Sequence, residues 1–513
     1  MTGQPSQQID ADLGAENLLR ARRLGIETLH EAVVFMRADC PVCRSEGFDA
    51  HARVKLSRGE RSVIATLYHV YTDVVAIDEA GLSETAWKDL GLSEGDLVRA
   101  SHPRPLVSLS RVRGKVYGER LDGVALGEII GDIVAHRYSD VHLSAFVTAC
   151  SSQGLDHDET VALTTAMVQA GDRLSWDVRP IVDKHSVGGL PGNRTTPIIV
   201  AIAAACGLTM PKTSSRAITS PAGTADTMET MAPVNLDIAA MRRVVDQEGG
   251  CIVWGGAVHL SPADDTIIRI ERALELDSPG QLVASVLSKK IAAGSTHLVI
   301  DMPVGPTAKV RSAMAAEELG SGLREVARAF GLKLSVVQSD GQQPVGRGIG
   351  PALEARDVLA VLQGARDAPR DLRERSVVLA GHLLELADHA ERGTGRGMAA
   401  QVLADGRAWH KFQAICEAQG GMRQPPFADH RRPVLAERSG EVALIDNRRL
   451  AMVAKLAGAP EDKAAGVELH VRVGTRVAQG EPLYTVHAET PGELAYAFEY
   501  LAANADIFRI VQP

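Results

Sequence analysis

The 513-residue chain has few aromatic side chains, few cysteines and no long apolar run. Aromatic residues make up 4% of the sequence, so its cores must be built from alanine, valine, leucine and isoleucine. Six cysteines, mostly far apart, are too few for a disulfide framework. No apolar stretch approaches the roughly 18 residues of a membrane-spanning helix, and the polar N-terminus lacks the pattern of a signal peptide. These absences predict a cytoplasmic protein with no membrane partner.

The chain also lacks an excess of positive charge. It contains 55 lysine and arginine residues against 64 aspartate and glutamate residues, which gives a formal net charge of −9. This balance argues against binding to nucleic-acid polymers or to anionic membranes. A phosphorylated small molecule would therefore have to be captured by positive charge concentrated at one site.

Cys40 and Cys43 form a CxxC pair. A zinc site would need a second pair or a histidine at suitable spacing, and only His51 lies nearby. Structural or surface thiols are the preferred interpretation, with metal binding and redox chemistry as alternatives. The sequence predicts no metal and no cofactor.

The clearest chemical signal is a loop rich in phosphate-binding residue types, which follows an apolar run ending at Val182. Residues 198–205 read as the helix behind this loop. Glycines let backbone N–H groups approach a ligand closely, and the start of the helix adds a favourable dipole for an anion. Lys184 adds a full positive charge, and Ser186 and Thr195 add hydroxyl donors.

A second polar segment covers residues 212–220, before a helix expected near Ala225. It surrounds Arg216 with five hydroxyl groups, those of Ser214, Ser215, Thr219, Ser220 and Thr224. Such a density of short polar residues typically marks a polar pocket or helix caps. One glycine-rich loop alone could be a structural turn, but two such loops predict one oxyanion held from two sides.

A third group of polar residues lies on a predicted helix over residues 282–292. Ser285 and Lys289 are four residues apart and therefore share one face. Such a pair on an otherwise apolar helix can bind the polar edge of a flat heterocycle, whereas the alternative is a solvated helix end at Lys289 and Lys290. Lys309 lies near another predicted helix start and, taken alone, is expected at the surface.

The order of predicted elements indicates an α/β multidomain protein. We expect four parts: a β-rich N-terminal module (1–102, with strands at 52–54, 62–68 and 73–77), a helical domain (103–175, joined by 262–292), a phosphate-binding α/β domain (176–430) and a C-terminal α+β half-barrel domain (431–513). The half-barrel resembles biotinyl and lipoyl carriers but lacks their exposed hairpin lysine.

The α/β domain is expected to contain a mixed, mostly parallel sheet with ligands at the carboxyl ends of its strands. The predicted strands are 180–182, 209–211, 252–254, 296–301 and 333–338. The predicted helices are 195–206, 239–248, 282–292, 307–330 and 354–362.

Five motifs in order resemble the thymidine phosphorylase family of pyrimidine nucleoside phosphorylases. They are KHSVGG from Lys184, SRAITS from Ser215, AGTAD from Ala222, SVLSKK from Ser285 and GRGIGPALE from Gly346. They are most similar to the long (type 2) branch, which includes AMP phosphorylase and bacterial thymidine phosphorylase homologues. The resemblance covers nearly the whole chain, including the N-terminal module that short thymidine phosphorylases lack.

The resemblance implies a homodimer or higher homo-oligomer that catalyses reversible phosphorolysis. Inorganic phosphate, as a substrate, and a nucleoside or nucleotide would give a free base and a pentose 1-phosphate or 1,5-bisphosphate. Asp277 matches the general acid of AMP phosphorylases, which must hold its proton near neutral pH. His185 matches a histidine near the reacting centre, and Lys184 is the third expected catalytic residue.

The resemblance also implies binding residues. Phosphate would be held by Lys184, Ser186, Thr195, Ser214 or Ser215, and Thr224. The nucleoside or nucleotide would contact Gly189, Ser215, Arg216, Ala217, Ile218, Thr219, Ser220, Thr224, Ser285, Lys289 and Lys309.

Substrate choice is where the sequence departs from the short thymidine phosphorylases. They place an arginine fifteen residues before the serine that matches Ser285, whereas this chain has Ile270 there. Residues 215–220 have the AMP phosphorylase form. The sequence therefore favours a nucleoside 5′-monophosphate such as AMP, with thymidine or deoxyuridine as the alternative.

Two other classes of function stay open. A magnesium-dependent phosphoribosyltransferase of the anthranilate type shares the implied fold, but a GTGGD-like loop would be expected in place of Lys184, His185 and Ser186. A non-catalytic nucleotide-binding regulator would bind the same ligands without turnover.

Overall fold

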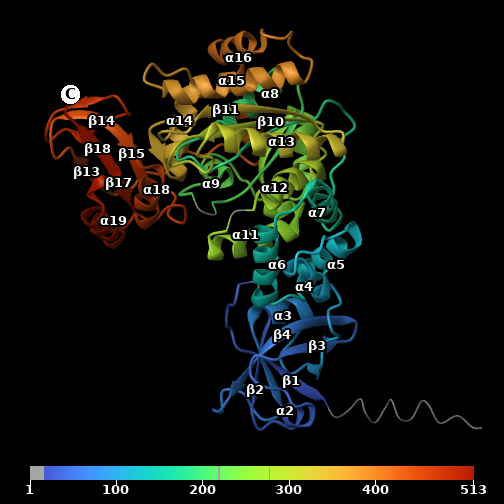
Figure 1. Ribbon diagram of the computed structural model, residues 1–513. Coiled ribbons are helices and arrows are strands. Elements are labelled where there is room, and N and C mark those ends of the chain that lie inside the picture. The colour runs from blue at the N-terminus through green and yellow to red at the C-terminus, as the bar shows by residue number, and fades with distance from the viewer. Residues whose placement is uncertain (1–16, 30, 218–219, 277, 513) are drawn as a thin grey trace, which may run out of the picture. The chain divides into compact units, whose positions relative to one another are not determined.

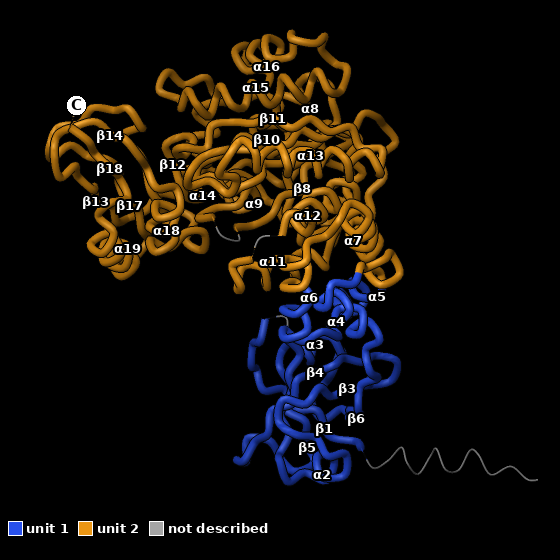
Figure 2. Tube along the Cα trace, in the orientation of Figure 1, with its two compact units in different colours: residues 1–119, 128–146 blue, residues 120–127, 147–513 orange. Residues whose placement is uncertain are grey.

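The computed structural model describes residues 17–29, 31–217, 220–276 and 278–512. The chain divides into two compact units, one made of residues 1–119 and 128–146 and the other of residues 120–127 and 147–513 (Figure 2). None of the helices among the described residues combines the length and the apolarity that a membrane crossing requires.

The first unit contains a closed barrel with the strand order β1-β5-β2-β4-β3-β6. The strands are β1 (Leu18–Arg23), β2 (Val33–Arg37), β3 (Arg53–Arg58), β4 (Arg61–Val70), β5 (Glu79–Leu82) and β6 (Leu97–Ser101). β1 and β5 are parallel, as are β2 and β4, and the other neighbours are antiparallel. Alternate residues face the interior, as Val54 and Leu56 of β3 do.

Short helices complete the first unit. They are α2 (Pro41–Glu46), α3 (Glu84–Leu90), α4 (Ser108–Val116), the part of α5 (Gly123–Val134) from residue 128, and the part of α6 (Asp140–Gln153) up to residue 146. Cys40 caps α2, because its Sγ accepts a hydrogen bond from the Cys43 N–H at 3.1 Å. Both cysteines belong to the barrel core, and no three His, Cys, Asp or Glu residues of the described chain are grouped as metal ligands.

One predicted strand of this unit is wrong. The structure has turns at residues 73–77, and the next strand is β5. Val75 is buried, but Val74 and Ile77 are exposed, so the segment lacks the alternation of buried and exposed side chains that a strand on a core shows. β1 lies outside the predicted strands because only Leu19 and Ala21 form its buried face.

Parallel strands form the centre of the second unit. β11 (Lys333–Asp340), β10 (His297–Val304) and β7 (Val182–Ser186) make one sheet, and β8 (Met210–Ser214) pairs with β9 (Gly250–Trp254). A parallel bridge between Ile181 and Thr209 joins the two sets in the order β11-β10-β7-β8-β9. The carboxyl ends of these strands therefore lie at one edge, where ligands bind in such sheets.

Helices cover both faces of this sheet (Figure 1). α15 (Arg370–Leu386) packs on β7, β10 and β11, beside α8 (Thr196–Ala205), which packs on β8 and β9. α13 (Ala313–Ala329) packs on β10 and β11 from the other face, next to α12 (Pro279–Ala292). α8 is apolar all round because the sheet and further helices enclose it.

Further helices surround this centre. α7 (His157–Gln169) packs against both α11 (Pro262–Leu274) and α12. The others are α9 (Thr224–Glu229), α10 (Ile238–Glu248), the 3-10 helix η1 (Gly255–Val258), α14 (Pro351–Leu362), α16 (Gly395–Ala404) and α17 (Arg407–Ala418).

Each strand and helix predicted for residues 176–430 overlaps an observed one, but several boundaries are wrong. The strand predicted over 180–182 coincides with β7 only at Val182, because β7 continues to Ser186, so Lys184 and Ser186 lie in the strand and not in the loop after it. The helix predicted over 307–330 begins only at Ala313. Ser312 caps it by accepting a hydrogen bond from the Ala315 N–H at 3.1 Å. The residues before the cap form a loop in which Val304 pairs with Val310.

The C-terminal region has two antiparallel sheets, ordered β12-β15-β17-β13 and β16-β14-β18. Their strands are β12 (Gly348–Ile349), β13 (His430–Leu435), β14 (Gly440–Ile445), β15 (Gly466–Leu469), β16 (Arg476–Val477), β17 (Pro482–Ala488) and β18 (Phe508–Val511). Helices α18 (Asn447–Leu456) and α19 (Pro491–Ala503) pack together, and η2 (Ala505–Ile507) precedes β18. The chain is thus a multidomain α/β protein, and the four predicted domain boundaries remain a prediction.

A buried ion cluster links the two sets of parallel strands. Asp183 of β7 accepts charged contacts from Lys212 of β8 at 3.1 Å and from Lys290 of α12 at 2.9 Å. All three side chains are buried. Burial alone would raise the pKa of Asp183, but the two ammonium groups outweigh it and hold that pKa below its ordinary value.

We predict that Asp183→Asn lowers the free energy of unfolding by about 3–5 kcal/mol, because it leaves two buried ammonium groups without their anion. Urea unfolding followed by tryptophan fluorescence measures the change. The control is Asp388→Asn, which removes an exposed partner of Lys333 and should cost less than about 1 kcal/mol. Equal losses of unfolding free energy in the two variants would show that the buried ion cluster contributes no more to stability than an exposed ion pair.

Candidate active site

The site is centred on Lys184, whose side chain is buried near the carboxyl end of β7. Its Nζ donates hydrogen bonds to Ser186 Oγ at 2.5 Å and to Thr195 Oγ1 at 2.7 Å. Thr195 occupies the N-cap position of α8. The structure therefore brings together three of the residues predicted to hold phosphate, beside the start of a helix that favours anions.

Two glycines shape the loop after β7 and leave no space for side chains. Gly192 has φ +70°, and a Cβ there would lie 1.9 Å from the carbonyl oxygen of Val345. Gly188 has φ +110°, and its Cβ would lie 3.1 Å from Cβ of Lys309. Lys309, predicted to bind the nucleotide, thus lies against this loop, and it is exposed.

Asp301 and Asn193 complete the surroundings of Lys184, and the sequence reasoning missed both. Asp301 lies in β10 directly opposite Ser186 of β7. Its Oδ2 accepts hydrogen bonds from Ser186 Oγ at 2.8 Å and from Asn193 Nδ2 at 2.9 Å. The available signal was an aspartate at the carboxyl end of an otherwise apolar predicted strand.

Burial lowers the pKa of the Lys184 ammonium to about 8. The carboxylate of Asp301 opposes this fall. Burial, together with the ammonium groups of Lys290, Lys212, Lys289 and Lys184, holds the pKa of His185 well below its ordinary value. His185 is therefore a neutral imidazole near neutral pH, and Lys184 is the titrating group of this pair.

The second polar segment approaches the first through Arg194, another residue that the sequence reasoning missed. Arg194 donates to Thr224 Oγ1 and to the carbonyl oxygen of Ala222, each at 2.8 Å, and its Nε donates to Glu354 at 2.6 Å. Ser214, at the end of β8, has a buried hydroxyl with no partner among the described residues. Ser214 and Thr224 thus remain candidates for contacting an anion.

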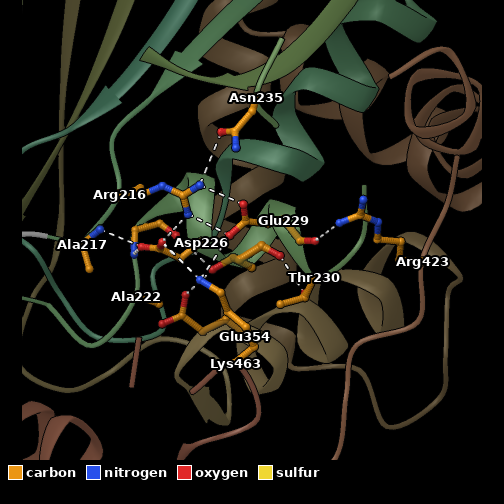
Figure 3. Close-up of polar contacts among 12 residues, drawn as sticks. Arg216, Ala217, Ala222, Asp226, Glu229, Thr230, Asn235, Glu354, Arg423 and Lys463 are labelled. Atoms are coloured by element: carbon orange, nitrogen blue, oxygen red, sulfur yellow. Dashed lines mark hydrogen bonds and ion pairs between the residues drawn. The ribbon is translucent and has the colours of Figure 1, made fainter. Parts of the chain in front are cut away.

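Arg216 was predicted to contact the nucleotide, but its charge is already engaged (Figure 3). The guanidinium donates two hydrogen bonds to Glu229 at 2.8 Å and one to Asp226 at 3.1 Å. It also lies 5.0 Å from the ring centroid of Trp254. The hydrogen bonds from Arg216 lower the pKa of Glu229 to about 2. In this arrangement Arg216 stabilises the loop by linking it to Asp226 and Glu229 of α9.

Asp226 holds both ends of the same loop. Its Oδ2 accepts hydrogen bonds from the Ala217 N–H at 2.6 Å and the Gly223 N–H at 2.9 Å (Figure 3). Lys463 lies 3.7 Å from Asp226 Oδ1 and 3.2 Å from Glu229. The Asp226 carboxylate therefore holds the backbone of Ala217 close to that of Gly223.

The other residues predicted to contact the nucleotide differ in exposure and in hydrogen bonding. Ser215 is exposed, and Ser220 donates its hydroxyl to the carbonyl oxygen of Ala222 at 2.8 Å. Ile218 and Thr219 lie outside the described residues. Gly189 is exposed at the tip of the first loop, with φ +49°.

The predicted base-binding pair lies on α12. Lys289 Nζ is 3.4 Å from Ser285 Oγ and donates to Asp264 Oδ2 of α11 at 2.5 Å. Asp264 is buried, and its other carboxylate oxygen has no partner among the described residues. Lys289 is therefore held by a carboxylate, which argues against a freely solvated helix end.

Of the two residues that bear on substrate choice, Ile270 and Asp277, the structure describes only Ile270. Ile270 is buried in α11, so an apolar side chain packs where short thymidine phosphorylases have an arginine. Asp277, the predicted general acid, lies outside the described residues, just before Ser278, which caps α12.

Family models and curated relatives both match this chain over most of its length. Residues 178–409 match the a/b domain of the Glycosyl transferase family, residues 112–171 its helical bundle domain, and residues 442–508 the Pyrimidine nucleoside phosphorylase C-terminal domain. A Sphingopyxis alaskensis protein named "Putative thymidine phosphorylase" is 63% identical over 497 residues, which cover 97% of this chain and 96% of that one. A protein of the same name from Polaromonas sp. is 62% identical over 494 residues, which cover 96% and 97%.

The fold is similar to the crystal structure of anthranilate phosphoribosyltransferase from Thermus thermophilus. The TM-score is 0.51 and the sequence identity 22%, over 60% of this chain and 98% of that chain. The likeness concerns the fold.

We predict that Asp226→Asn loosens the loop, because the amide oxygen accepts the two backbone N–H bonds without a negative charge and the amide nitrogen cannot accept the bond from Arg216. Loss of charge-assisted bonds worth about 1.5–3 kcal/mol should speed amide hydrogen exchange at Ala217 and Gly223 about tenfold to a hundredfold. Glu229→Gln is the matched control, because it weakens the contact with Arg216 and leaves the backbone clamp. Equal protection of the two amides in both variants would contradict the clamp.

Proposed function

This chain belongs to the pyrimidine nucleoside phosphorylase family of pentosyltransferases, and we propose that it cleaves a nucleoside 5′-monophosphate by phosphorolysis. The products would be a free base and a pentose 1,5-bisphosphate. Inorganic phosphate would attack the anomeric carbon C1′ while the bond to the base loosens.

The observation that carries the proposal is the buried Lys184 ammonium between the hydroxyls of Ser186 and Thr195. A cation, two hydroxyls and a helix N-terminus at the carboxyl edge of a parallel sheet suit an oxyanion. In a chain of net charge −9, such a site concentrates the attraction for phosphate at one point.

The protein would act mainly by positioning. Phosphate held beside C1′ turns a bimolecular attack into a nearly unimolecular one, which can lower a barrier by about 7–11 kcal/mol. The positive charge of Lys184 would balance the phosphate while an oxocarbenium-like sugar forms. Neutral His185 can donate or accept one hydrogen bond at the reacting centre, and Asp277 would give a proton to the leaving base.

The identity of the base and sugar rests on a few residues. Buried Ile270 replaces the arginine of short thymidine phosphorylases, which supports a nucleotide such as AMP. The names of the relatives support a second candidate, thymidine or deoxyuridine. Lys289 and Ser285 offer donors to the edge of either kind of base.

We predict that the purified protein releases base from AMP, in the presence of phosphate, faster than from CMP, UMP, thymidine or uridine. Chromatography of the free bases measures the release. Lys184→Ala should reduce it by at least about a hundredfold, because the attacking phosphate loses the cation that binds it and positions it beside C1′. Lys333→Ala, which removes an exposed lysine paired with Asp388, is the control and should retain full activity.

Release from thymidine alone would move the proposal to the second candidate. Silence with every substrate, together with nucleotide binding, would favour a non-catalytic regulator and refute phosphorolysis. Full activity of Lys184→Ala would remove Lys184 from the phosphate site.

We predict that Asp277→Asn reduces adenine release by about a hundredfold or more, because a general acid typically contributes about 10²–10⁴ to a rate. Release of uracil or thymine should fall less, since these bases can spread negative charge over two carbonyl oxygens. Asp246→Asn, an exposed carboxylate of α10, is the control. Unchanged adenine release in Asp277→Asn would show that another group supplies the proton.

A further inference from the structure

Asp301 is an unusual residue for the centre of an apolar sheet. It is fully buried in β10, between neighbours such as Ile300 and Met302 that are also fully buried. A carboxylate in such a place is costly unless several donors compensate it. Here Ser339 Oγ of β11 donates to Oδ1 at 2.5 Å, in addition to the bonds from Ser186 and Asn193 to Oδ2.

Asp301 also fixes the direction of the hydrogen bonds around Lys184. A carboxylate can only accept, so the single hydroxyl proton of Ser186 points to Asp301. Ser186 Oγ is then the acceptor for Lys184 Nζ at 2.5 Å. Among the described residues the Lys184 ammonium donates two hydrogen bonds, to Ser186 and Thr195, so the third of its N–H groups can serve an incoming anion.

The charge of Asp301 acts on the same ammonium. Burial lowers the pKa of Lys184 to about 8, and Asp301 and Asp183 raise it against this effect. The guanidinium groups of Arg194 and Arg375 lower it further. Arg375 of α15 reaches to 3.9 Å from Asp301 Oδ2. Asp301 is thus the carboxylate that faces both the ammonium and an opposing arginine.

We propose that Asp301 is a positioning residue of the phosphate site, which orders Ser186 and Asn193 and keeps the Lys184 ammonium charged with one N–H aimed at phosphate. This role rests on the proposed function, because it assumes that the anion at Lys184 is the substrate phosphate. Asp301 itself does not touch the phosphate, since its two oxygens are occupied by donors of the protein.

A purely structural role is the competing explanation, because Asp301 also ties β7, β10 and β11 together. The two explanations differ in their pH dependence. In the wild type, phosphate binding should weaken as the pH rises through about 8, where Lys184 loses its proton. Without Asp301 the ammonium loses its compensating charge, so the weakening should move to lower pH by about one unit or more.

The test measures the binding of inorganic phosphate by calorimetry, and kcat/KM for phosphate, across a pH series in Asp301→Asn. At about pH 8 the affinity should fall about fivefold, and at higher pH about tenfold, as a shift of one pKa unit requires. Ser339→Ala is the matched control, because it removes one bond to Asp301 and keeps the carboxylate. Its alkaline limit should stay at the wild-type pH.

Arg375→Gln supplies a test of opposite sign if Asp301→Asn does not fold. Removing this cation takes away a charge that lowers the pKa of Lys184 and that opposes Asp301, so the alkaline limit should move to higher pH. A structural role predicts loss of stability in both variants and no shift of the limit in either direction.

The outcomes separate the two proposals. A wild-type protein that neither binds phosphate nor releases base refutes the proposed function. A wild-type protein that does both, beside a folded Asp301→Asn with unchanged affinity and an unchanged alkaline limit, overturns the role of Asp301 alone.

Discussion

The burial of one ammonium group, that of Lys184, is the constraint on which the organisation of the site depends. A buried cation must be compensated, and here two hydroxyl oxygens and the charge of Asp301 do so. Within the described part of the chain the ammonium donates only these two hydrogen bonds, so its third N–H can serve an anion. The neighbouring Asp183 pairs with the ammonium groups of Lys212 and Lys290, and its charge also raises the pKa of Lys184.

The second polar segment illustrates a different use of charge. Arg216 lies within a motif whose composition suggests ligand binding, yet Asp226 and Glu229 take up its guanidinium. Together with the backbone bonds to Asp226, this ion pair gives the loop a fixed frame on which smaller groups, such as the unpartnered hydroxyl of Ser214, can meet an anion. One motif can therefore contain both residues that stabilise a loop, such as Arg216, and neighbouring residues that are candidates for contacting a ligand, such as Ser214.

Much of the secondary structure around the site follows from local pattern. The apolar run 298–300 of β10 and the apolar residues of α8 were predictable, because a buried parallel strand and a buried helix both need near-continuous apolar side chains. The pattern failed at residues 73–77, where β-branched residues occur without a buried face, and at 307–312, where a serine cap delays the start of α13. The composition of a segment does not reveal whether the fold places another strand beside it for pairing.

The residue types of the candidate phosphate site, the order of its two polar segments and the resemblance to the family could be read from the sequence, because they depend on motifs that are contiguous in the chain. Only the tertiary structure decided which partners those residues have. Asp301 meets Ser186 across 115 residues through the register of β10 on β7, and Arg194 meets Thr224 across 30. Strand register and loop closure set these contacts, and both arise from packing between segments whose separation in the chain carries no local signal.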